Sequence, residues 1–398
     1  MAISEDKSSA RKYFPDSLKN FISDSTIVSF SPGRINLIGE FTDYNMGYVL
    51  PAAVDKGVYV AVTPRHDQQI RLHSLDFNDT FQSNTTDLTP AAAGAWPNYL
   101  LGVCAEFKHA GIPLRGFDAA ITGNIPIGSG LSSSAAVECA TAMAVNHMMQ
   151  THFGKLELVK MSLRAENNYV GVQCGIMDQF ASMFGKADHA IKLDCRSLDF
   201  EYLPLNMDDL CIVLLNSNVK HSHGSSDYNE RRAQCEAGVA IIRQQEPQVS
   251  FLRDATLEMI DHWLSTGDAT IYKRCRFIVE ENERVVGAAE DLRKNDLVSF
   301  GRKMFASHDG LQHLFEASCA ELDFLVNCVR EHPGVLGARM MGGGFGGCTI
   351  NLVKAGAVES LIAEVSAQYN TSMKKQLTPH IAGIEAGTTL LQTPPAGN

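Results

Sequence analysis

The segment from residue 33 to residue 45, GRINLIGEFTDYN, places three charged side chains in a run that otherwise resembles a protein core. Arg34, Glu40 and Asp43 stand among isoleucine, leucine and phenylalanine residues, a mixture that fits no simple surface pattern. A charge in apolar surroundings is unfavourable unless it is paired or hydrogen-bonded. We therefore treat these charges as candidate functional groups, and Phe41, which separates the two acids, as an unusual neighbour.

Another carboxylate in apolar surroundings lies within residues 165–184, AENNYVGVQCGIMDQFASMF. Asp178 follows Ile176 and Met177 and precedes Phe180, so its ionised form needs a cation or hydrogen bonds. Glu166 lies twelve residues earlier. Each acid also has an ordinary alternative, because Asp178 suits a helix N-cap and Glu166 suits an exposed helical position.

The segment from residue 123 to residue 136, GNIPIGSGLSSSAA, has the composition of an anion-binding loop. Its proline and glycines predict a turn, and three serines then open a run with helical character. The free N–H groups at a helix start favour an anion, and a hydroxyl there, for which Ser134 is the candidate, is able to ligate Mg²⁺. The alternative is a plain cluster of N-cap serines. The segment matches neither the GxxxxGK[ST] nor the GxGxxG nucleotide motif.

A third glycine-marked segment spans residues 337–349, GARMMGGGFGGCT, with five glycines in six positions around Phe345. Such a loop suits close approach to a ligand or to another backbone. A flexible loop is the alternative, but residues 348–353 continue as a strand pattern, which predicts that the loop is anchored.

The elements that must position these segments indicate a mixed α+β protein of two lobes. Residues 57–62, 116–121 and 210–215 have strand patterns, and residues 132–149 and 271–293 have helical patterns. Residues 187–204 are typical of strand, turn and strand, and are a candidate for the crossover between lobes. We place the domains at 1–195 and 196–398.

Composition excludes several classes of function. The net charge of −11 argues against nucleic acid or an anionic membrane as a partner. The N-terminal residues lack the apolar core of a signal peptide, and the longest apolar runs have only strand length. The ten cysteines show no CxxC pair and no zinc spacing, so we expect reduced thiols in a cytoplasmic protein.

Taken together, these segments resemble the galactokinase branch of the small-molecule kinases that include homoserine, mevalonate and phosphomevalonate kinases. Residues 33–45 resemble the sugar-binding signature of the branch, residues 123–136 the phosphate loop of the superfamily, and residues 339–349 its C-terminal glycine loop. A fourth stretch, residues 216–235, is similar to galactokinases in particular. The order of the segments is preserved over nearly the whole chain.

The resemblance implies an N-terminal lobe like the second domain of ribosomal protein S5, a ferredoxin-like C-terminal lobe and an active site between them. It also implies the reaction, in which ATP phosphorylates the anomeric hydroxyl of α-D-galactose. We expect the small molecules galactose and MgATP as partners, and a monomer.

The resemblance also assigns roles in phosphoryl transfer. Asp178 matches the proposed catalytic base, and Arg34 matches its cationic partner, which also stabilises the transferring phosphoryl group. Ser134 and Glu166 match the positions that hold Mg²⁺. Trp96 resembles an adenine-side contact, although an ordinary core position is the alternative. The residues matched to the phosphates are Gly128, Ser129, Gly130, Leu131, Ser132, Ser133 and Ser134.

For the sugar, Asp43 matches a carboxylate that accepts hydrogen bonds from O3 and O4, and Glu40 one that accepts from O6. Tyr228 and the backbone of Gly175 match further sugar contacts. Carboxylates suit this task because hydroxyls donate, and an unpaired acceptor penalises the wrong epimer by about 1–3 kcal/mol. Asn36 and Asp55 are expected to be structural.

Two positions depart from the family pattern. Phe41 stands where galactokinases usually carry a histidine that helps to bind O6, and His223 replaces a usual leucine. The phenylalanine removes a hydrogen-bonding group, so we expect tolerance of sugars altered at C6, unless Glu40 suffices and Phe41 only packs.

Two rival functions remain from sequence. One is a related sugar kinase that acts on N-acetylgalactosamine, and the other is a non-catalytic sensor of galactose and ATP. Such sensors lack a Ser-Ala pair in the phosphate loop, whereas this chain has Ser134-Ala135. Together with Asp178 and Arg34, this pair favours an enzyme.

Overall fold

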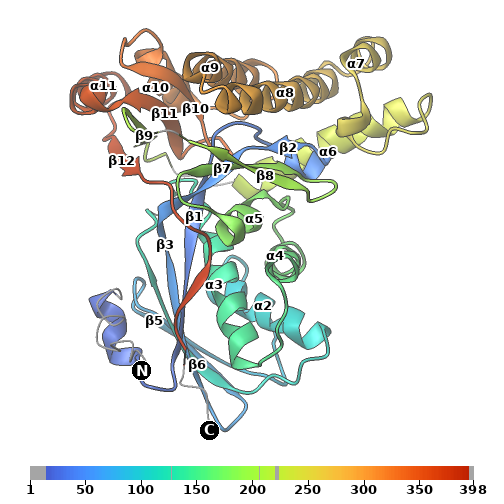
Figure 1. Ribbon diagram of the computed structural model, residues 1–398. Helices are drawn as coiled ribbons and strands as arrows, with labels where there is room; N and C mark the ends of the chain where they lie inside the picture. The colour runs from blue at the N-terminus through green and yellow to red at the C-terminus, as the bar shows by residue number, and fades with distance from the viewer. Residues whose placement is uncertain (1–14, 127, 206, 220–223, 394–398) are drawn as a thin grey trace.

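The computed structural model describes residues 15–126, 128–205, 207–219 and 224–393, which form two lobes joined by long strands and a small sheet (Figure 1). The first lobe contains a six-stranded sheet covered by helices, and the second contains a four-stranded sheet beside long helices. The mixed helix and strand architecture in two lobes that the sequence predicts is confirmed.

The six-stranded sheet has the order β13-β1-β3-β6-β4-β5, so the last strand of the chain returns to pair with the first. All of its neighbouring strands are antiparallel except β4 and β6, which are parallel. Its strands are β1 (Ile27–Asn36), β3 (Pro51–Pro64), β4 (Gln69–Ser74), β5 (Asp79–Asn84), β6 (Phe117–Gly123) and β13 (Thr389–Gln392).

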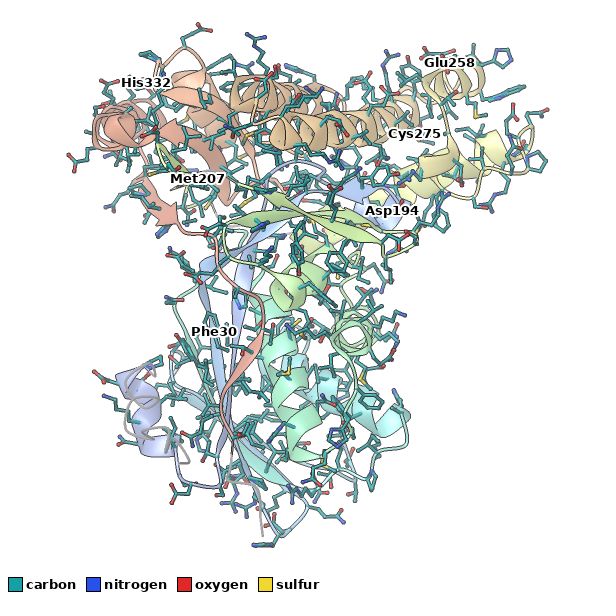
Figure 2. All side chains as sticks on the ribbon, in the orientation of Figure 1. Phe30, Asp194, Met207, Glu258, Cys275 and His332 are labelled. Atoms are coloured by element: carbon teal, nitrogen blue, oxygen red, sulfur yellow. The ribbon has the colours of Figure 1, made fainter. Side chains whose placement is uncertain are left out.

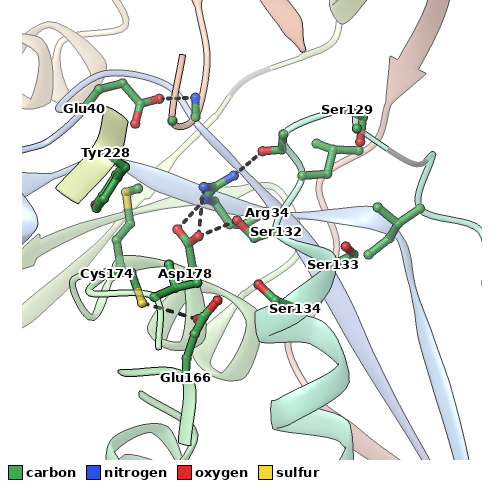
Figure 3. Close-up of a pocket in the computed structure, with 18 of the residues that line it drawn as sticks. Arg34, Glu40, Ser129, Ser132, Ser133, Ser134, Glu166, Cys174, Asp178 and Tyr228 are labelled. Atoms are coloured by element: carbon green, nitrogen blue, oxygen red, sulfur yellow. Dashed lines mark hydrogen bonds and ion pairs between the residues drawn. The ribbon is translucent and has the colours of Figure 1, made fainter. Parts of the chain in front are cut away.

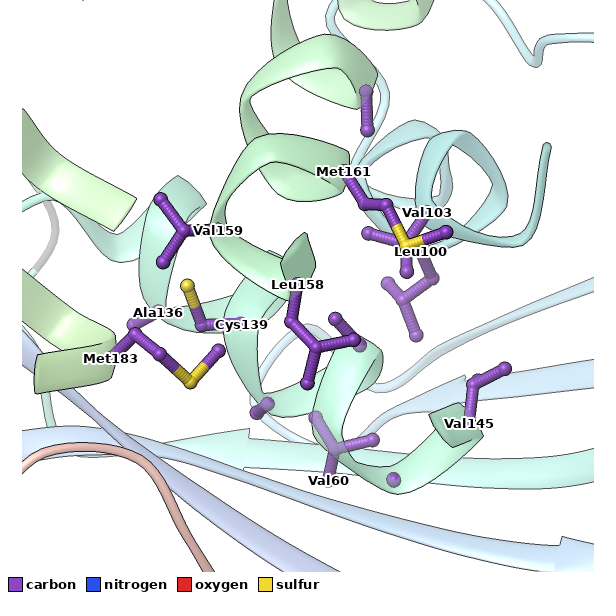
Figure 4. Close-up of a cluster of buried hydrophobic side chains, with 14 of the residues drawn as sticks. Val60, Leu100, Val103, Ala136, Cys139, Val145, Leu158, Val159, Met161 and Met183 are labelled. Atoms are coloured by element: carbon purple, nitrogen blue, oxygen red, sulfur yellow. The ribbon is translucent and has the colours of Figure 1, made fainter. Parts of the chain in front are cut away.

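Four helices pack on one face of this sheet and form the largest core with it (Figure 1). The alanine-rich α3 lies directly against β1 and β3, where small side chains allow close packing. Buried side chains from the sheet and the helices meet in a continuous apolar cluster, part of which is drawn in Figure 4. The helices are α2 (Pro97–His109), α3 (Ser133–Met148), α4 (Lys155–Arg164) and α5 (Met177–Phe184).

A three-stranded sheet of order β2-β7-β8 lies between this core and the second lobe. Its strands are β2 (Tyr48–Val49), β7 (His189–Asp194) and β8 (Phe200–Pro204). The strand, turn and strand predicted for residues 187–204 are therefore present. The domain boundary at 195/196 falls between β7 and β8, and it stays a prediction.

The second lobe contains an antiparallel sheet of order β10-β11-β9-β12 and most of the remaining helices. Its strands are β9 (Leu210–Asn216), β10 (Val335–Met340), β11 (Cys348–Lys354) and β12 (Thr378–Ala382). The helices are α6 (Gly224–Arg243), α7 (Leu257–Trp263), α8 (Ala269–Arg293), α9 (Leu297–His313), α10 (Ala320–Arg330) and α11 (Val358–Met373).

The predicted helices at 132–149 and 271–293 are confirmed as α3 and α8, and the strand patterns correspond to β3, β6, β9 and β11. Side chains fill both lobes, and all ten cysteines are free thiols, including Cys275 on α8 (Figure 2). Within the described ranges, every helix is too short or too polar to cross a membrane. His223 lies outside the described residues.

Candidate active site

A cavity of about 340 Å³ lies where β1, α5, the start of α3 and the C-terminal glycine loop meet (Figure 3). It gathers most of the side chains that the sequence singles out, although they are far apart in the chain. The predicted site residues that line it are Arg34, Glu40, Phe41, Asp43, Gly128, Ser129, Gly130, Leu131, Ser132, Ser133, Ser134, Glu166, Asp178 and Tyr228.

Arg34 and Asp178 form a two-pronged ion pair in this cavity (Figure 3). Arg34 Nε donates to Asp178 Oδ1 at 2.8 Å, and Nη2 donates to Oδ2 at 3.0 Å. Burial alone lowers the pKa of Arg34, but the nearby carboxylates, Asp178 first, raise it above its ordinary value. Asp178 lies in the first turn of α5 rather than at its N-cap, which is Ile176, so the N-cap alternative is wrong.

The phosphate-loop segment is tied to this pair. Arg34 Nη1 donates to the carbonyl oxygen of Gly130 at 2.6 Å. Ser132 precedes α3 in the left-handed conformation, with φ 55°, and its hydroxyl donates to Asp178 Oδ2 at 2.5 Å instead of capping the helix. The plain N-cap alternative therefore fails for Ser132. The loop and Asp178 are held in one arrangement at the start of α3, where unpaired N–H groups suit phosphate oxygens.

Glu166 lies in a π-helical turn, Ala165–Val170, and is only 6% exposed, so the exposed alternative is wrong. Turns of this type often occur at functional sites. Its Oε2 accepts hydrogen bonds from Gln179 Nε2 at 2.5 Å and Cys174 Sγ at 3.3 Å. Burial and the charge of Asp178 raise the pKa of Glu166, while hydrogen bonds from Ser134, Cys174 and Gln179 lower it. Ser134 and Glu166 are thus adjacent.

Glu40 joins the sugar-signature segment to the C-terminal glycine loop. Its Oε1 accepts a hydrogen bond from the backbone N–H of Gly342 at 2.8 Å (Figure 3) and forms an ion pair with Nη2 of the buried Arg339 at 2.9 Å. None of the residues that the structure describes donates a hydrogen bond to Glu40 Oε2. Because Glu40 lines the cavity, this second oxygen is available to a ligand.

Asp43 is buried beside Gly175, near the charged groups of Asp178, Glu40 and Arg34. Its Oδ1 accepts a hydrogen bond from the backbone N–H of Tyr44 at 2.9 Å, and a Cβ on Gly175 would lie only 2.2 Å from Oδ2. Gly175 therefore has to be glycine for Asp43 to keep this position. Burial, together with the charge of Asp178, raises the pKa of Asp43 to about 7.

This raised pKa predicts a pH-dependent effect of Asp43→Asn on stability. The folded state binds the proton of Asp43 more tightly than the unfolded chain, so its contribution to stability is present at low pH and is lost as pH rises through about 7. We therefore expect the melting temperature of Asp43→Asn to exceed that of the wild type by a few degrees at pH 8.5 and by about half as much at pH 5.5, because the loss begins at the ordinary pKa of 3.8. Asp199→Asn, at an exposed position, is the control. A difference in melting temperature that is equal at both pH values would contradict the expectation.

Phe41 occupies an aromatic cluster at the sugar side of the cavity. It is 3% exposed, and its ring centroid lies 4.6 Å from that of Phe315 and 5.5 Å from that of Tyr228. Its backbone has φ 64°, a conformation that bulky residues rarely adopt and that concentrates at functional sites. The carbonyl of Phe41 accepts a hydrogen bond from the side chain of Asn45 at 2.9 Å, which supports this turn.

Trp96 and Gly175 line neighbouring cavities rather than the central one. Trp96 lines a larger, more apolar cavity of about 800 Å³ that shares Tyr99, Gly128, Ser133 and Ser134 with the central cavity. Its Nε1 donates to Asp79 Oδ2 at 2.8 Å. Trp96 is partly buried against the core of the first lobe and also borders a cavity that opens beside the phosphate-loop segment, so its adenine-side role stays a prediction.

Several residues of the site have no distinguishing signal in the sequence. Tyr99 and Cys174 line the central cavity, and neither has a distinguishing neighbour in the sequence. Gln179 donates both to Glu166 and, at 3.1 Å, to the fully buried Glu138. In the sequence, the buried pair of Glu138 and Gln179 is indicated only by the presence of a glutamate within the alanine-rich run that forms α3.

Comparison with known proteins places the chain in a family. Models of the N-terminal and C-terminal domains of GHMP kinases match residues 98–186 and 288–371, and the galactokinase galactose-binding signature matches residues 18–64. A galactokinase from Thermotoga neapolitana is 42% identical over 350 residues, which are 88% of this chain and 96% of that protein. A galactokinase from Fusobacterium nucleatum is 40% identical over 364 residues, covering 90% of this chain and 93% of that protein.

Solved structures agree with these relatives. The structure of Lactococcus lactis galactokinase complexed with galactose matches with a TM-score of 0.88 and 35% identity, covering 96% of this chain and 98% of that one. Methanococcus jannaschii mevalonate kinase shares the fold, with a TM-score of 0.65 at 17% identity over 90% of this chain and 98% of that one. With its sugar signature, phosphate loop and glycine loop around one cavity, the chain belongs to the galactokinase family of the GHMP kinases.

Proposed function

We propose that this chain transfers the γ-phosphoryl group of ATP to the anomeric hydroxyl of α-D-galactose, the entry step of galactose catabolism. The observation that carries the proposal is the Arg34–Asp178 ion pair, which lies between the phosphate-loop segment and the carboxylates of the sugar signature. A reaction centre at this position has a nucleotide on one side and a hydroxyl-rich ligand on the other. The family relationship favours the same activity.

Asp178 is proposed as the base that takes the proton of the C1 hydroxyl. Arg34 holds its carboxylate by two hydrogen bonds and also offers positive charge to the transferring phosphoryl group. Phosphoryl transfer asks a protein mainly for positioning and charge stabilisation, and the bonds from Arg34 and Ser132 fix the orientation of Asp178. The carboxylate is therefore directed by its partners before any substrate binds.

On the sugar side, Asp43 is proposed to accept hydrogen bonds from O3 and O4, and Glu40 Oε2 from O6. Tyr228 and the backbone of Gly175 complete the contacts. Asp43 accepts best when ionised, and galactose binding would lower its raised pKa because a carboxylate that receives hydroxyl hydrogen bonds resists protonation. The buried position of each acid penalises a sugar that leaves it unpaired.

On the nucleotide side, the backbone from Gly128 to Ser134 is proposed to hold the phosphates, with the base beside Trp96. The central cavity suits a divalent cation, because among the described residues of its wall there are the carboxylates of Glu40, Asp43, Glu166 and Asp178 but only one cation, Arg34. Ser134 and Glu166 would hold Mg²⁺, whose protein ligands are often only one or two beside the substrate phosphates. The ion would neutralise charge on the β- and γ-phosphates.

We also propose a cytoplasmic monomer without nucleic acid or membrane partners. Free, mostly buried thiols suit a reducing compartment. The net charge of −11 opposes binding to polyanions.

An assay of ADP release over a sugar panel tests the proposed function. The panel contains galactose, 6-deoxygalactose, N-acetylgalactosamine, glucose and arabinose. We expect galactose to have the highest kcat/KM. A higher kcat/KM for N-acetylgalactosamine would mean that this sugar, and not galactose, is the substrate. Binding of a hexose without turnover would favour a sensor.

Phe41→His tests whether the phenylalanine relaxes specificity at C6. The imidazole adds a hydrogen-bonding group for O6, worth about 0.5–1.5 kcal/mol. We therefore expect the ratio of kcat/KM for galactose to that for 6-deoxygalactose to rise about threefold to tenfold. Phe41→Leu, which stays apolar, is the control and should keep the wild-type ratio. If Phe41→His also keeps it, the phenylalanine only packs.

A further inference from the structure

The side chain of Arg339 is a buried cation outside the set of residues assigned above. It lies near the end of β10, is 0% exposed, and is among the largest side chains that are fully buried. Burying a guanidinium is costly unless it is paired. Its partners all lie toward the sugar signature: Nη1 donates to the carbonyl of Asn36 at 2.8 Å, and Nη2 lies 2.9 Å from Glu40 Oε1.

Glu40 is therefore held from two directions by the same C-terminal segment. Gly342, three residues after Arg339, donates its N–H to the same Oε1 atom at 2.8 Å. With Oε1 occupied by both groups, the orientation of the carboxylate is fixed and Oε2 remains for the ligand. An aspartate at position 40 would be too short to reach both partners, and a glutamine would keep the shape but lose the charge that pairs with Arg339.

The backbone next to Glu40 is held by a further buried carboxylate. Glu281 on α8 accepts a hydrogen bond from the N–H of Gly39 at 2.9 Å and from Ser307 Oγ at 2.6 Å, while Arg284 Nε donates to its other oxygen at 2.6 Å. Arg339 also contributes to keeping the pKa of Glu281 low, opposing the effect of burial. Arg339 thus lies close both to Glu40 and to Glu281, the carboxylate that holds the backbone N–H just before Glu40.

We propose that Arg339 is a positioning residue for the sugar site, which acts by holding Glu40 Oε1 so that Oε2 faces the C6 end of galactose. The proposal rests on the proposed function for the identity of the sugar. It assigns the arginine of the glycine-loop segment to sugar binding rather than to the nucleotide. Because Arg339 acts through Glu40, its loss should change the KM for galactose more than the KM for ATP.

The experiment compares wild type, Glu40→Gln, Arg339→Met, Arg339→Lys and the double variant Glu40→Gln/Arg339→Met. For each we would measure kcat, both KM values and the melting temperature. Arg339→Met should raise the KM for galactose about tenfold or more and the KM for ATP less than threefold, and Arg339→Lys, which keeps the charge, should recover part of the loss.

The double variant keeps the test valid if Arg339→Met fails to fold. Removing both charges leaves no unpaired ion, so the double variant should be more stable than Arg339→Met. If Arg339 acts only through Glu40, the double variant should have the galactose KM of Glu40→Gln alone. If the rises in galactose KM of the two single variants multiply in the double variant, the proposal is overturned. A folded Arg339→Met whose galactose KM is that of the wild type would also overturn it.

The control is Arg253→Met, which removes another ion pair between distant segments. Arg253 Nη2 lies 3.0 Å from Asp194 Oδ2, and the two side chains are 18% and 20% exposed. We expect lower stability with both KM values unchanged. Equal rises in both KM values in Arg339→Met would mean a general structural role and contradict the proposal. A wild type that does not phosphorylate galactose would instead refute the proposed function.

Discussion

Asp178→Asn is expected to lower kcat with galactose and ATP by about 10³-fold, within the range for loss of a general base. Asparagine has nearly the same shape, but its amide cannot accept the proton of the C1 hydroxyl. The KM for galactose should change only a few-fold, because the proposed sugar contacts come from Glu40, Asp43 and Tyr228. Steady-state kinetics with purified variant and wild type measure both quantities.

Binding measurements decide whether the loss in Asp178→Asn is chemical. Calorimetry with galactose should give a dissociation constant close to that of the wild type, and the exposed Asp199→Asn should keep wild-type kinetics. A kcat for Asp178→Asn within tenfold of the wild type would remove Asp178 from the role of base. It would mean that the enzyme needs little activation of the nucleophile.

Arg34→Met is expected to abolish turnover and also to destabilise the fold. Arg34 is 4% exposed and binds Asp178 and the carbonyl of Gly130, so its loss leaves a carboxylate without its cation. We expect kcat to fall at least as far as in Asp178→Asn, and the free energy of unfolding to fall by about 3 kcal/mol, the lower end for a broken buried pair because Asp178 is 23% exposed. Denaturant unfolding and kinetics measure the two effects.

A double variant separates these effects. Arg34→Met/Asp178→Asn should regain much of the stability, because no unpaired charge remains, but none of the activity. Arg34→Lys keeps one charge without the two-pronged geometry and should be more stable than Arg34→Met while remaining slow. If Arg34→Met were as stable as the wild type, the ion pair would not contribute to the fold.

The sequence predicted the segments of the site because each has a local signal. Glycines, serines and prolines mark the loop before α3, and charged residues in apolar runs mark Arg34, Glu40, Asp43 and Asp178. The helical and strand periods of the long elements were also sufficient for α3, α8 and the two-lobed architecture. Each of these features depends on neighbours within about one turn or one strand, which a single sequence displays.

Contacts between distant segments were not accessible from the sequence. Glu40 and Gly342 are separated by 302 residues, and nothing local indicates that the glycine loop donates to this carboxylate. Arg339 was assigned from the sequence only to the glycine-marked segment, yet the fold places it on β10 and buries it completely. The left-handed Phe41 and the pair formed by Glu138 and Gln179 likewise depend on tertiary packing rather than on local preference.

The position of the transferred phosphate is the most direct test of the account. Galactose and ATP would be incubated with the wild-type protein, and the sugar product examined by phosphorus and proton NMR. We expect one product, galactose 1-phosphate, with the phosphorus coupled to the anomeric proton, and none with Asp178→Asn over the same time. A phosphate on C6, or release of ADP without a sugar phosphate, would contradict it.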